Sequence, residues 1–135
     1  MELMDKVAIV TGGSRGIGYA AVKAFLQEGA VVVLCASRQE TADKAVAQLQ
    51  EEIPGAKVEG IWPDLSSYAS VKAAFDRVAQ VYGKIDILVN NAGVSESTPF
   101  SEYTEETFDK VMDLNVKGMF NCSRAASEVM ERRGS

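Results

Sequence analysis

An apolar run that breaks into a glycine-rich turn and then resumes as helical sequence constrains this chain more than any other stretch. It is Val7 to Gly18, VAIVTGGSRGIG. Its first four residues are apolar without alternation, which favours a strand covered on both faces in a parallel sheet. Glycines after such a strand let the backbone approach a ligand, and the following helix points its N–H groups and positive dipole end at an anion. The stretch therefore predicts a strand, a phosphate-binding turn and a helix, with a pyrophosphate as the favoured anion.

The spacing within this turn is TGxxxGxG, from Thr11 to Gly18. The dinucleotide fingerprint GxGxxG does not fit at the strand end, and a GxGxxA string from Gly16 to Ala21 starts where the helix should already have begun. A Walker turn is excluded because no Lys followed by Ser or Thr comes after Gly18. The alternative is an ordinary strand-to-helix turn, which requires neither Thr11 nor three spaced glycines.

Composition indicates one globular domain over 1–135. The chain is 47% hydrophobic and 24% charged, which is ordinary for a folded domain of this length. Its net charge is −5 and it has no Lys/Arg cluster, so a nucleic-acid partner is not expected. The longest wholly apolar run, Ala30 to Ala36, is too short to span a bilayer, and the N-terminus lacks an apolar signal segment. We therefore expect a cytoplasmic protein with no membrane partner.

The chain has two cysteines and no histidine. Cys35 lies in an apolar strand pattern and Cys122 in a helical one, with no CxxC pair, so we expect two buried thiols and no metal site. The missing histidines exclude a Ser/His or Cys/His nucleophile pair.

Strand and helix patterns alternate along the whole chain. Strands are predicted over 7–10, 30–36, 57–62 and 85–90, and helices over 19–29, 40–52, 66–83 and 104–132. Alternation of this kind predicts an α/β fold with a doubly wound, Rossmann-like parallel sheet in the strand order 3-2-1-4. The fourth strand, IDILVN, reads as largely buried although this order leaves it at an edge. We therefore expect a chain truncated before the fifth strand, so that 1–135 is an incomplete dinucleotide-binding domain.

Four motifs resemble those of the short-chain dehydrogenase/reductase family, and the resemblance extends over all 135 residues. They are the turn TGGSRGIG, Asp64-Leu65 after the third strand, NNAG after the fourth strand, and Asn115 in the last helix. The resemblance implies that Asn115 belongs to the catalytic tetrad. It implies a cofactor site that comprises Gly12, Ser14, Arg15, Gly16, Ile17, Gly18, Asp64, Leu65, Asn90, Asn91, Ala92 and Gly93.

Each of the polar residues in these motifs also has a structural interpretation. Asp64 can accept from an adenine amino group, or it can cap the helix that follows. Asn90 and Asn91 can touch the cofactor ribose, tie loop backbone together, or do both. Asn115 interrupts a helical pattern, so it is expected either to mark a kink or to be exposed, and the family role gives its carbonyl a water in a proton relay.

Cofactor choice depends on the residues after the second strand. NAD-binding proteins usually have Asp or Glu there for the ribose 2′-hydroxyl, whereas a 2′-phosphate requires a cation. This chain has Ser37 and Arg38, Arg15 offers a second guanidinium, and Glu40 falls on the following helix. The pattern predicts NADP(H) as the cofactor. The alternative is that Arg38 is a solvated surface charge.

The family's proton-donating pair is a Tyr followed four residues later by Lys, with a Ser that orients the substrate. Two YxxxK strings occur, at Tyr19 and Tyr68, but both precede the fourth strand, whereas the family's pair follows the fifth. We therefore expect the catalytic Ser, Tyr and Lys to lie beyond Ser135, and the chain of 135 residues to be inactive alone.

The predicted function is that of an NADP(H)-dependent oxidoreductase that moves hydride between nicotinamide and a carbonyl or secondary alcohol, with this chain as the cofactor half. The motifs are similar to those of 3-oxoacyl-acyl-carrier-protein reductases and hydroxysteroid dehydrogenases, and they do not identify the substrate. The resemblance also implies a homo-oligomer, because the long last helix contributes to dimers and tetramers in the family. The alternative is a non-catalytic nucleotide-binding or partner-binding module, complete at 135 residues.

Overall fold

The computed structural model describes residues 2–91 and 104–132. Four parallel strands form one sheet in the order β3-β2-β1-β4, which confirms the predicted order 3-2-1-4. The strands are β1 (Val7–Thr11), β2 (Val31–Cys35), β3 (Val58–Ile61) and β4 (Ile87–Val89). The helices are α1 (Gly16–Gln27), α2 (Gln39–Glu52), α3 (Tyr68–Tyr82) and α4 (Glu105–Arg132).

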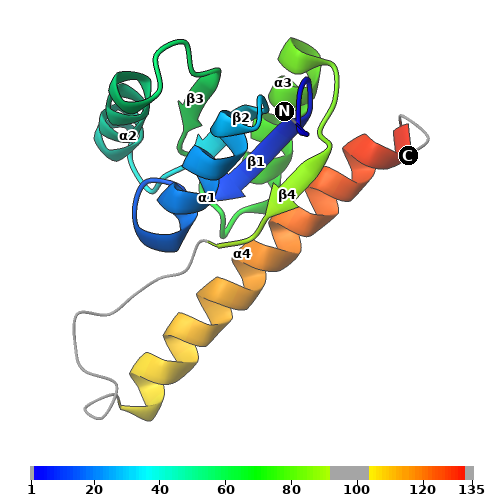
Figure 1. The fold of residues 1–135 in the computed structure, drawn as a ribbon. Coiled ribbons are helices and arrows are strands. Elements are labelled where there is room, and N and C mark those ends of the chain that lie inside the picture. Colours follow the sequence, from blue (N-terminus) through cyan, green and yellow to red (C-terminus); the bar gives the residue numbers. More distant parts are fainter. Residues whose placement is uncertain (1, 92–103, 133–135) are drawn as a thin grey trace.

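The sheet lies between two layers of helices (Figure 1). Strand β1 is buried at all five positions, because its side chains alternate between two separate cores. Val7 and Ile9 pack with residues of α3 and α4, whereas Ala8 and Val10 pack with residues of α1 and α2. The unbroken apolar run of β1 therefore corresponds to a central strand covered on both faces.

Strand β4 differs from β1 in burial. Its three residues are only half-buried, and β4 pairs with β1 alone among the described strands. The sequence pattern suggested a largely buried strand, but at the edge of the described sheet only one side of β4 has a neighbouring strand.

The helix boundaries follow local signals in the sequence. Ser67 caps α3 by accepting from the Ser70 N–H, and Thr104 caps α4 by accepting from the Thr107 N–H at 3.1 Å. Gly29 and Gly83 follow α1 and α3 with φ values of 90° and 84°, as expected for glycines that end helices. The predicted ends of the helices at 29 and 83 and the predicted start at 104 are confirmed, and of the two serines at the predicted start of α3, Ser66 and Ser67, it is Ser67 that caps the helix.

Helix α4 is the longest element, and only part of it packs on the body of the protein. Its C-terminal half contributes four buried residues to the core beside α3, while its N-terminal half extends past the sheet (Figure 1). Large apolar side chains on α4 are more than 40% exposed at Phe108, Met112, Val116, Met119 and Phe120. The apolar spacing of α4 therefore predicts the helix correctly, but not which positions are buried.

The two cysteines are buried, as predicted, and they lie in the same core. Cys35 at the end of β2 and Cys122 in α4 are both 1% exposed. Burial raises the pKa of the Cys122 thiol to about 11 and that of Cys35 further still. Both thiols therefore stay protonated at neutral pH and behave as core residues.

Candidate functional site

The turn between β1 and α1 leaves the start of a helix open. Gly12 and Gly16 have φ values of 65° and 60°, in the left-handed region that favours glycine. Arg15 is the N-cap residue, and no side chain of the described residues caps α1. The first turn of α1 also holds no acidic residue, and Ile17 is 82% exposed. The first N–H groups of α1 and the positive end of its dipole are therefore available to an anion.

The packing around the turn differs between its two sides. A Cβ added at Gly18 would lie 2.0 Å from the Gly12 carbonyl oxygen, so only glycine allows α1 to approach the turn this closely. A Cβ added at Gly16 would meet no heavy atom within 4 Å. The turn is therefore packed against α1 on one side and open at the helix start, which leaves space beside Gly16 for a phosphate group. The residues present fit a bound pyrophosphate.

Hydrogen bonds join this turn to the end of β4. The Asn91 N–H donates to Thr11 Oγ1 at 3.0 Å, and Asn91 Nδ2 donates to the Gly12 carbonyl at 3.3 Å. The Thr11 hydroxyl donates to the Val89 carbonyl at 3.3 Å. These bonds bring two motifs that lie about 80 residues apart to one edge of the sheet. They also show that the Asn91 amide ties backbone together, one of the roles expected for it.

Asn90, the first residue of NNAG, contacts helix α4. Asn90 Nδ2 donates to Ser123 Oγ of α4 at 3.1 Å, so this side chain joins the end of β4 to the long helix. Ala92 and Gly93 lie outside the described residues.

Asp64 and Leu65 lie in the short connection between β3 and α3. Asp64 Oδ1 accepts from the Ser66 N–H at 3.0 Å and from the Ser66 hydroxyl at 2.6 Å. These two bonds lower the pKa of Asp64, and Lys117 lowers it further. Asp64 is not the N-cap of α3, because Ser67 fills that position. Within residues 2–91 and 104–132, the Asp64 Oδ2 oxygen has no hydrogen-bond partner, so it is available to a ligand.

Asn121 of α4 is a residue of this region that the motifs do not include. It is 3% exposed, and its Nδ2 donates to the Leu65 carbonyl at 2.9 Å. The signal for it in the sequence is a polar residue on the apolar face of a helix, next to Cys122 and one turn before Ala125. Such a residue needs a partner, but the sequence does not show which one.

Asn115 lies within α4 and does not interrupt it. The helix is continuous from 105 to 132, and Asn115 is half-buried. The side chain is therefore not exposed, which was one of the two alternatives, and the other, a kink, stays a prediction. Gly118 of the same helix faces Leu65, with 3.5 Å between the Leu65 Cβ and a Cβ added at Gly118.

Two guanidinium groups follow neighbouring strands. Arg15 comes after β1 and Arg38 after β2, and because these strands pair in parallel, with Thr11 opposite Cys35, both arginines lie at the carboxyl edge of the sheet. Ser37 is exposed, and the Arg38 side chain is 73% exposed with its Nη1 3.9 Å from Glu40. Glu40 is in the first turn of α2, as predicted.

The tyrosine hydroxyls of the two YxxxK strings are both hydrogen-bonded to glutamates. The Tyr19 hydroxyl donates to Glu52, and the Tyr68 hydroxyl donates to Glu128 at 2.6 Å. Burial and the bond to Glu52 raise the pKa of Tyr19 to about 12, and the bond to Glu128 raises that of Tyr68. A tyrosine that gives its proton to a substrate needs a lowered pKa, so both shifts are in the opposite direction.

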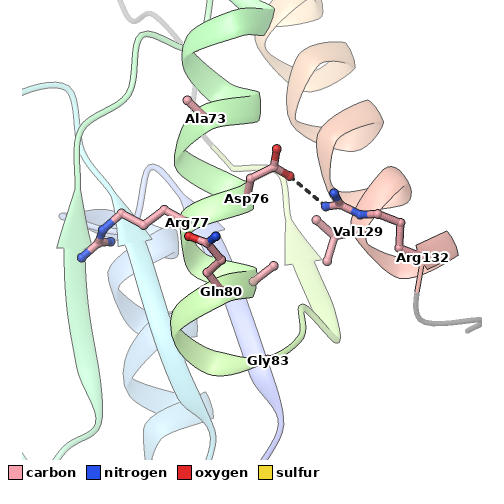
Figure 2. A pocket seen from close by; sticks show the side chains of 8 residues that line it. Ala73, Asp76, Arg77, Gln80, Gly83, Val129 and Arg132 are labelled. Atoms are coloured by element: carbon pink, nitrogen blue, oxygen red, sulfur yellow. Dashed lines mark hydrogen bonds and ion pairs between the residues drawn. The ribbon is translucent and has the colours of Figure 1, made fainter.

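A pocket in the described part of the chain lies away from these residues. Figure 2 shows it between α3 and α4, where Asp76 pairs with Arg132 at 2.8 Å, and its volume is about 480 Å³. Gly83, at the end of α3, also lines it, so the pocket reaches the opposite end of α3 from Asp64. It contains none of the predicted site residues.

Two further findings concern metal and membrane. Among residues 2–91 and 104–132, no group of three or more Cys, Asp or Glu side chains could hold a metal ion. In the same part of the chain, no helix has the length and apolar character needed to cross a bilayer. The cytoplasmic location stays a prediction.

Known proteins with similar sequences cover the whole chain. Residues 6–135 match the family described as short chain dehydrogenase. A 3α-hydroxysteroid dehydrogenase of Mediterraneibacter gnavus is 53% identical over 134 residues, which are 99% of this chain and 54% of the relative. A 3-oxoacyl-acyl-carrier-protein reductase of Thermotoga maritima is 36% identical over 137 residues, which cover 100% of this chain and 55% of the relative.

A solved structure has the same fold. The crystal structure of NAD+-bound xylitol dehydrogenase matches with a TM-score of 0.86 and 31% identity, over 98% of this chain and 51% of that one. The chain spans about half the length of the curated relatives that it matches. Its match over residues 6–135, on a parallel sheet whose first turn is open to a phosphate, shows that the chain belongs to the short-chain dehydrogenase family of NAD(P)(H)-dependent oxidoreductases.

Proposed function

We propose that this chain supplies the NADP(H)-binding part of an oxidoreductase that acts on a carbonyl or secondary alcohol. The observation that carries the proposal is the start of α1, which has neither a side-chain cap nor an acidic residue and lies open behind the glycine turn. When bound, the nicotinamide gives or takes the hydride. The chain's own residues hold the rest of the dinucleotide at the carboxyl edge of the sheet.

Each motif has a proposed part in holding the cofactor. The turn residues Gly12, Ser14, Arg15, Gly16, Ile17 and Gly18 cradle the pyrophosphate at the start of α1. Asp64 accepts from the adenine amino group through Oδ2, and Leu65 borders the base. Asn90, Asn91, Ala92 and Gly93 border the ribose on the nicotinamide side. Asn115 holds a water through its backbone carbonyl, as the family resemblance implies.

The proposed preference for NADP(H) depends on Arg38 and Arg15. Arg15 and Arg38 follow the paired strands β1 and β2 at the carboxyl edge of the sheet, and Ser37 adds a hydroxyl. The Glu40 carboxylate competes for Arg38, but at 3.9 Å between two side chains that are 73% and 84% exposed this pair is weak. A 2′-phosphate carries more charge than one carboxylate and can therefore displace Glu40 from Arg38.

Equilibrium binding of NADPH and NADH to the wild type and to Arg38→Ala tests the cofactor choice. We expect Arg38→Ala to weaken NADPH binding roughly tenfold and to leave NADH binding unchanged, because the lost interaction is a charge-assisted hydrogen bond. Lys44→Ala, which removes an exposed positive charge from α2, is the matched control and should change neither affinity. An unchanged preference for NADPH in Arg38→Ala would contradict the assignment.

For the substrate we propose only its chemical class, a carbonyl or secondary alcohol. The relative at 53% identity is a 3α-hydroxysteroid dehydrogenase, so a hydroxysteroid is the first secondary alcohol to assay. We propose that the 135-residue chain binds cofactor without turnover, because neither Tyr19 nor Tyr68 is placed to give up a proton. Oxidation of the alcohol by this chain alone would contradict that part of the proposal.

We also propose that the chain self-associates through α4. Its exposed apolar side chains lie at Phe108, Met112, Val116, Met119 and Phe120, at spacings that place them along one side of the helix. Sedimentation velocity of the wild type should show a species larger than the monomer, and Phe120→Glu should reduce it. A wild type that stays monomeric at all concentrations would exclude this interface.

A further inference from the structure

Asn121 is a buried amide whose partner lies on a predicted cofactor-binding segment. It is 3% exposed in the middle of α4, among the apolar residues that pack this helix against α3. Its Nδ2 donates to the Leu65 carbonyl at 2.9 Å, across 56 residues of sequence. Leu would fill the same space without an amide to satisfy, so packing alone does not explain a polar side chain here.

The bond from Asn121 completes a set of contacts around Asp64. The Asp64 N–H donates to Ser70 Oγ of α3 at 2.9 Å, and Ser66 donates twice to Asp64 Oδ1. The Asp64 carbonyl accepts from the Ser67 N–H at 3.0 Å, and the next carbonyl along the chain, that of Leu65, is held by Asn121 of α4. The backbone on both sides of the Asp64 side chain is therefore attached to a helix, and one oxygen of its carboxylate is occupied. The orientation of Oδ2 follows from these contacts.

We propose that Asn121 is a positioning residue for adenine recognition, which acts by fixing the Asp64-Leu65 backbone to α4. The inference rests on the proposed function, in which Asp64 Oδ2 accepts from the adenine amino group. Asn121 itself touches no part of the cofactor. Its effect is to keep the short connection between β3 and α3 in one conformation before the base arrives, so that binding does not have to order it.

The two cofactors that test this inference differ only along the edge of the base that carries the adenine amino group. They are NADPH and its hypoxanthine analogue, in which a carbonyl oxygen replaces that amino group and the neighbouring ring nitrogen N1 carries a proton. If Asp64 accepts from the amino group, the wild type should bind NADPH about tenfold more tightly than the analogue, the difference that one hydrogen bond to a charged group makes. The ratio of the two dissociation constants measures adenine recognition separately from stability and from phosphate binding.

Replacement of Asn121 should remove this discrimination. In Asn121→Leu the Leu65 carbonyl loses its donor, and we expect the ratio to fall from about tenfold to about twofold or less. Should Asn121→Leu fold poorly, Asn121→Ala serves, because its smaller side chain lets water reach the same carbonyl. Gly118→Ala is the matched control, since it contacts the same Leu65 at an ordinary 3.5 Å and keeps the hydrogen bond. Its ratio should stay at the wild-type value.

The outcomes separate this inference from the proposed function. A wild type that binds both cofactors equally well would contradict the adenine contact of Asp64, and with it the role of Asn121. A wild type that discriminates, with Asn121 variants that weaken both cofactors alike and keep the tenfold ratio, would show that Asn121 has only a structural role. Loss of the ratio in the Asn121 variants, but not in Gly118→Ala, would support the positioning role.

Discussion

Helices α1 and α3 both start at the carboxyl edge of the sheet, but their first turns are built in opposite ways. The start of α3 is satisfied by its own chain, since Ser67 accepts from the Ser70 N–H after a turn held by Asp64 and Ser66. The start of α1 follows Gly12 and begins with Gly16, both with positive φ, and its N-cap residue, the cationic Arg15, makes no capping bond. The first N–H groups of α3 therefore have a partner within the chain, whereas those of α1 are left to solvent or to an anion such as the proposed pyrophosphate.

The first turns of α2 and α4 can be compared with those of α1 and α3. Helix α4 resembles α3, because Thr104 caps it and Glu105 and Glu106 occupy its first turn. Helix α2 lacks a side-chain cap, as α1 does, but it carries Glu40 in its first turn. Among the four described helices, α1 alone combines an open start with no acidic side chain nearby in sequence.

The largest effect should come from Gly18, where the open turn touches its helix. Gly18→Ala forces a Cβ to within 2.0 Å of the Gly12 carbonyl oxygen. We therefore expect the free energy of unfolding, measured in urea, to fall by roughly 3 kcal/mol. Gly55→Ala is the control, because Gly55 has a φ of 82° but open space around it, and it should cost only about 1 kcal/mol. Equal losses in the two variants would show that the contact with Gly12 is unimportant.

The start of α1 can be converted to resemble that of α3. Arg15→Asp supplies a capping carboxylate, which should stabilise the protein by about 1 kcal/mol and weaken NADPH binding about tenfold or more, since the same N–H groups cannot serve both anions. Thermal unfolding and equilibrium binding measure the two effects on one sample. Arg15→Ala, which removes the cation without adding a cap, should not gain stability. A variant that is more stable and binds NADPH as well as the wild type would refute the role of the open start.

The reverse change removes the cap from α3. Ser67→Ala leaves the Ser70 N–H without its acceptor and should cost about 1 kcal/mol in urea unfolding, with no change in NADPH affinity. Ser127→Ala, at an exposed position of α4, is the control and should stay within about 0.5 kcal/mol of the wild type. Loss of cofactor affinity in Ser67→Ala would mean that the two helix starts do not have separate roles.

The smallest effect concerns pH, at the turn that precedes α3. The bonds from Ser66 lower the pKa of Asp64 in the folded protein. The stabilisation that these bonds give is therefore present above the unfolded pKa of the carboxyl and is lost as the pH falls through the lower, folded value. An NMR titration of the Asp64 carboxyl carbon should have its midpoint below that of an ordinary aspartate, and Ser66→Ala should raise it. A midpoint at or above the ordinary value would contradict the hydrogen-bonded turn.

Much of the fold and part of the site could be predicted from the sequence, because the signals involved are local. The apolar run before Thr11 predicted a central strand, and Gly29, Gly83, Thr104 and the pair Ser66-Ser67 predicted helix ends, because each acts within a few residues of its own position. The right-handed crossover of parallel strands then leads to the order 3-2-1-4 without further information. The glycine turn was recognisable for the same reason.

Contacts between distant parts of the chain were decided by the tertiary structure alone. Asn91 holds the Gly12 carbonyl, and Asn121 holds that of Leu65, across 79 and 56 residues. An amide reveals in the sequence only that it needs a partner, and which partner it finds depends on how the helices pack on the sheet. Exposure on α4 was decided in the same way, since the periodicity of a helix shows which residues share a side but not what covers that side.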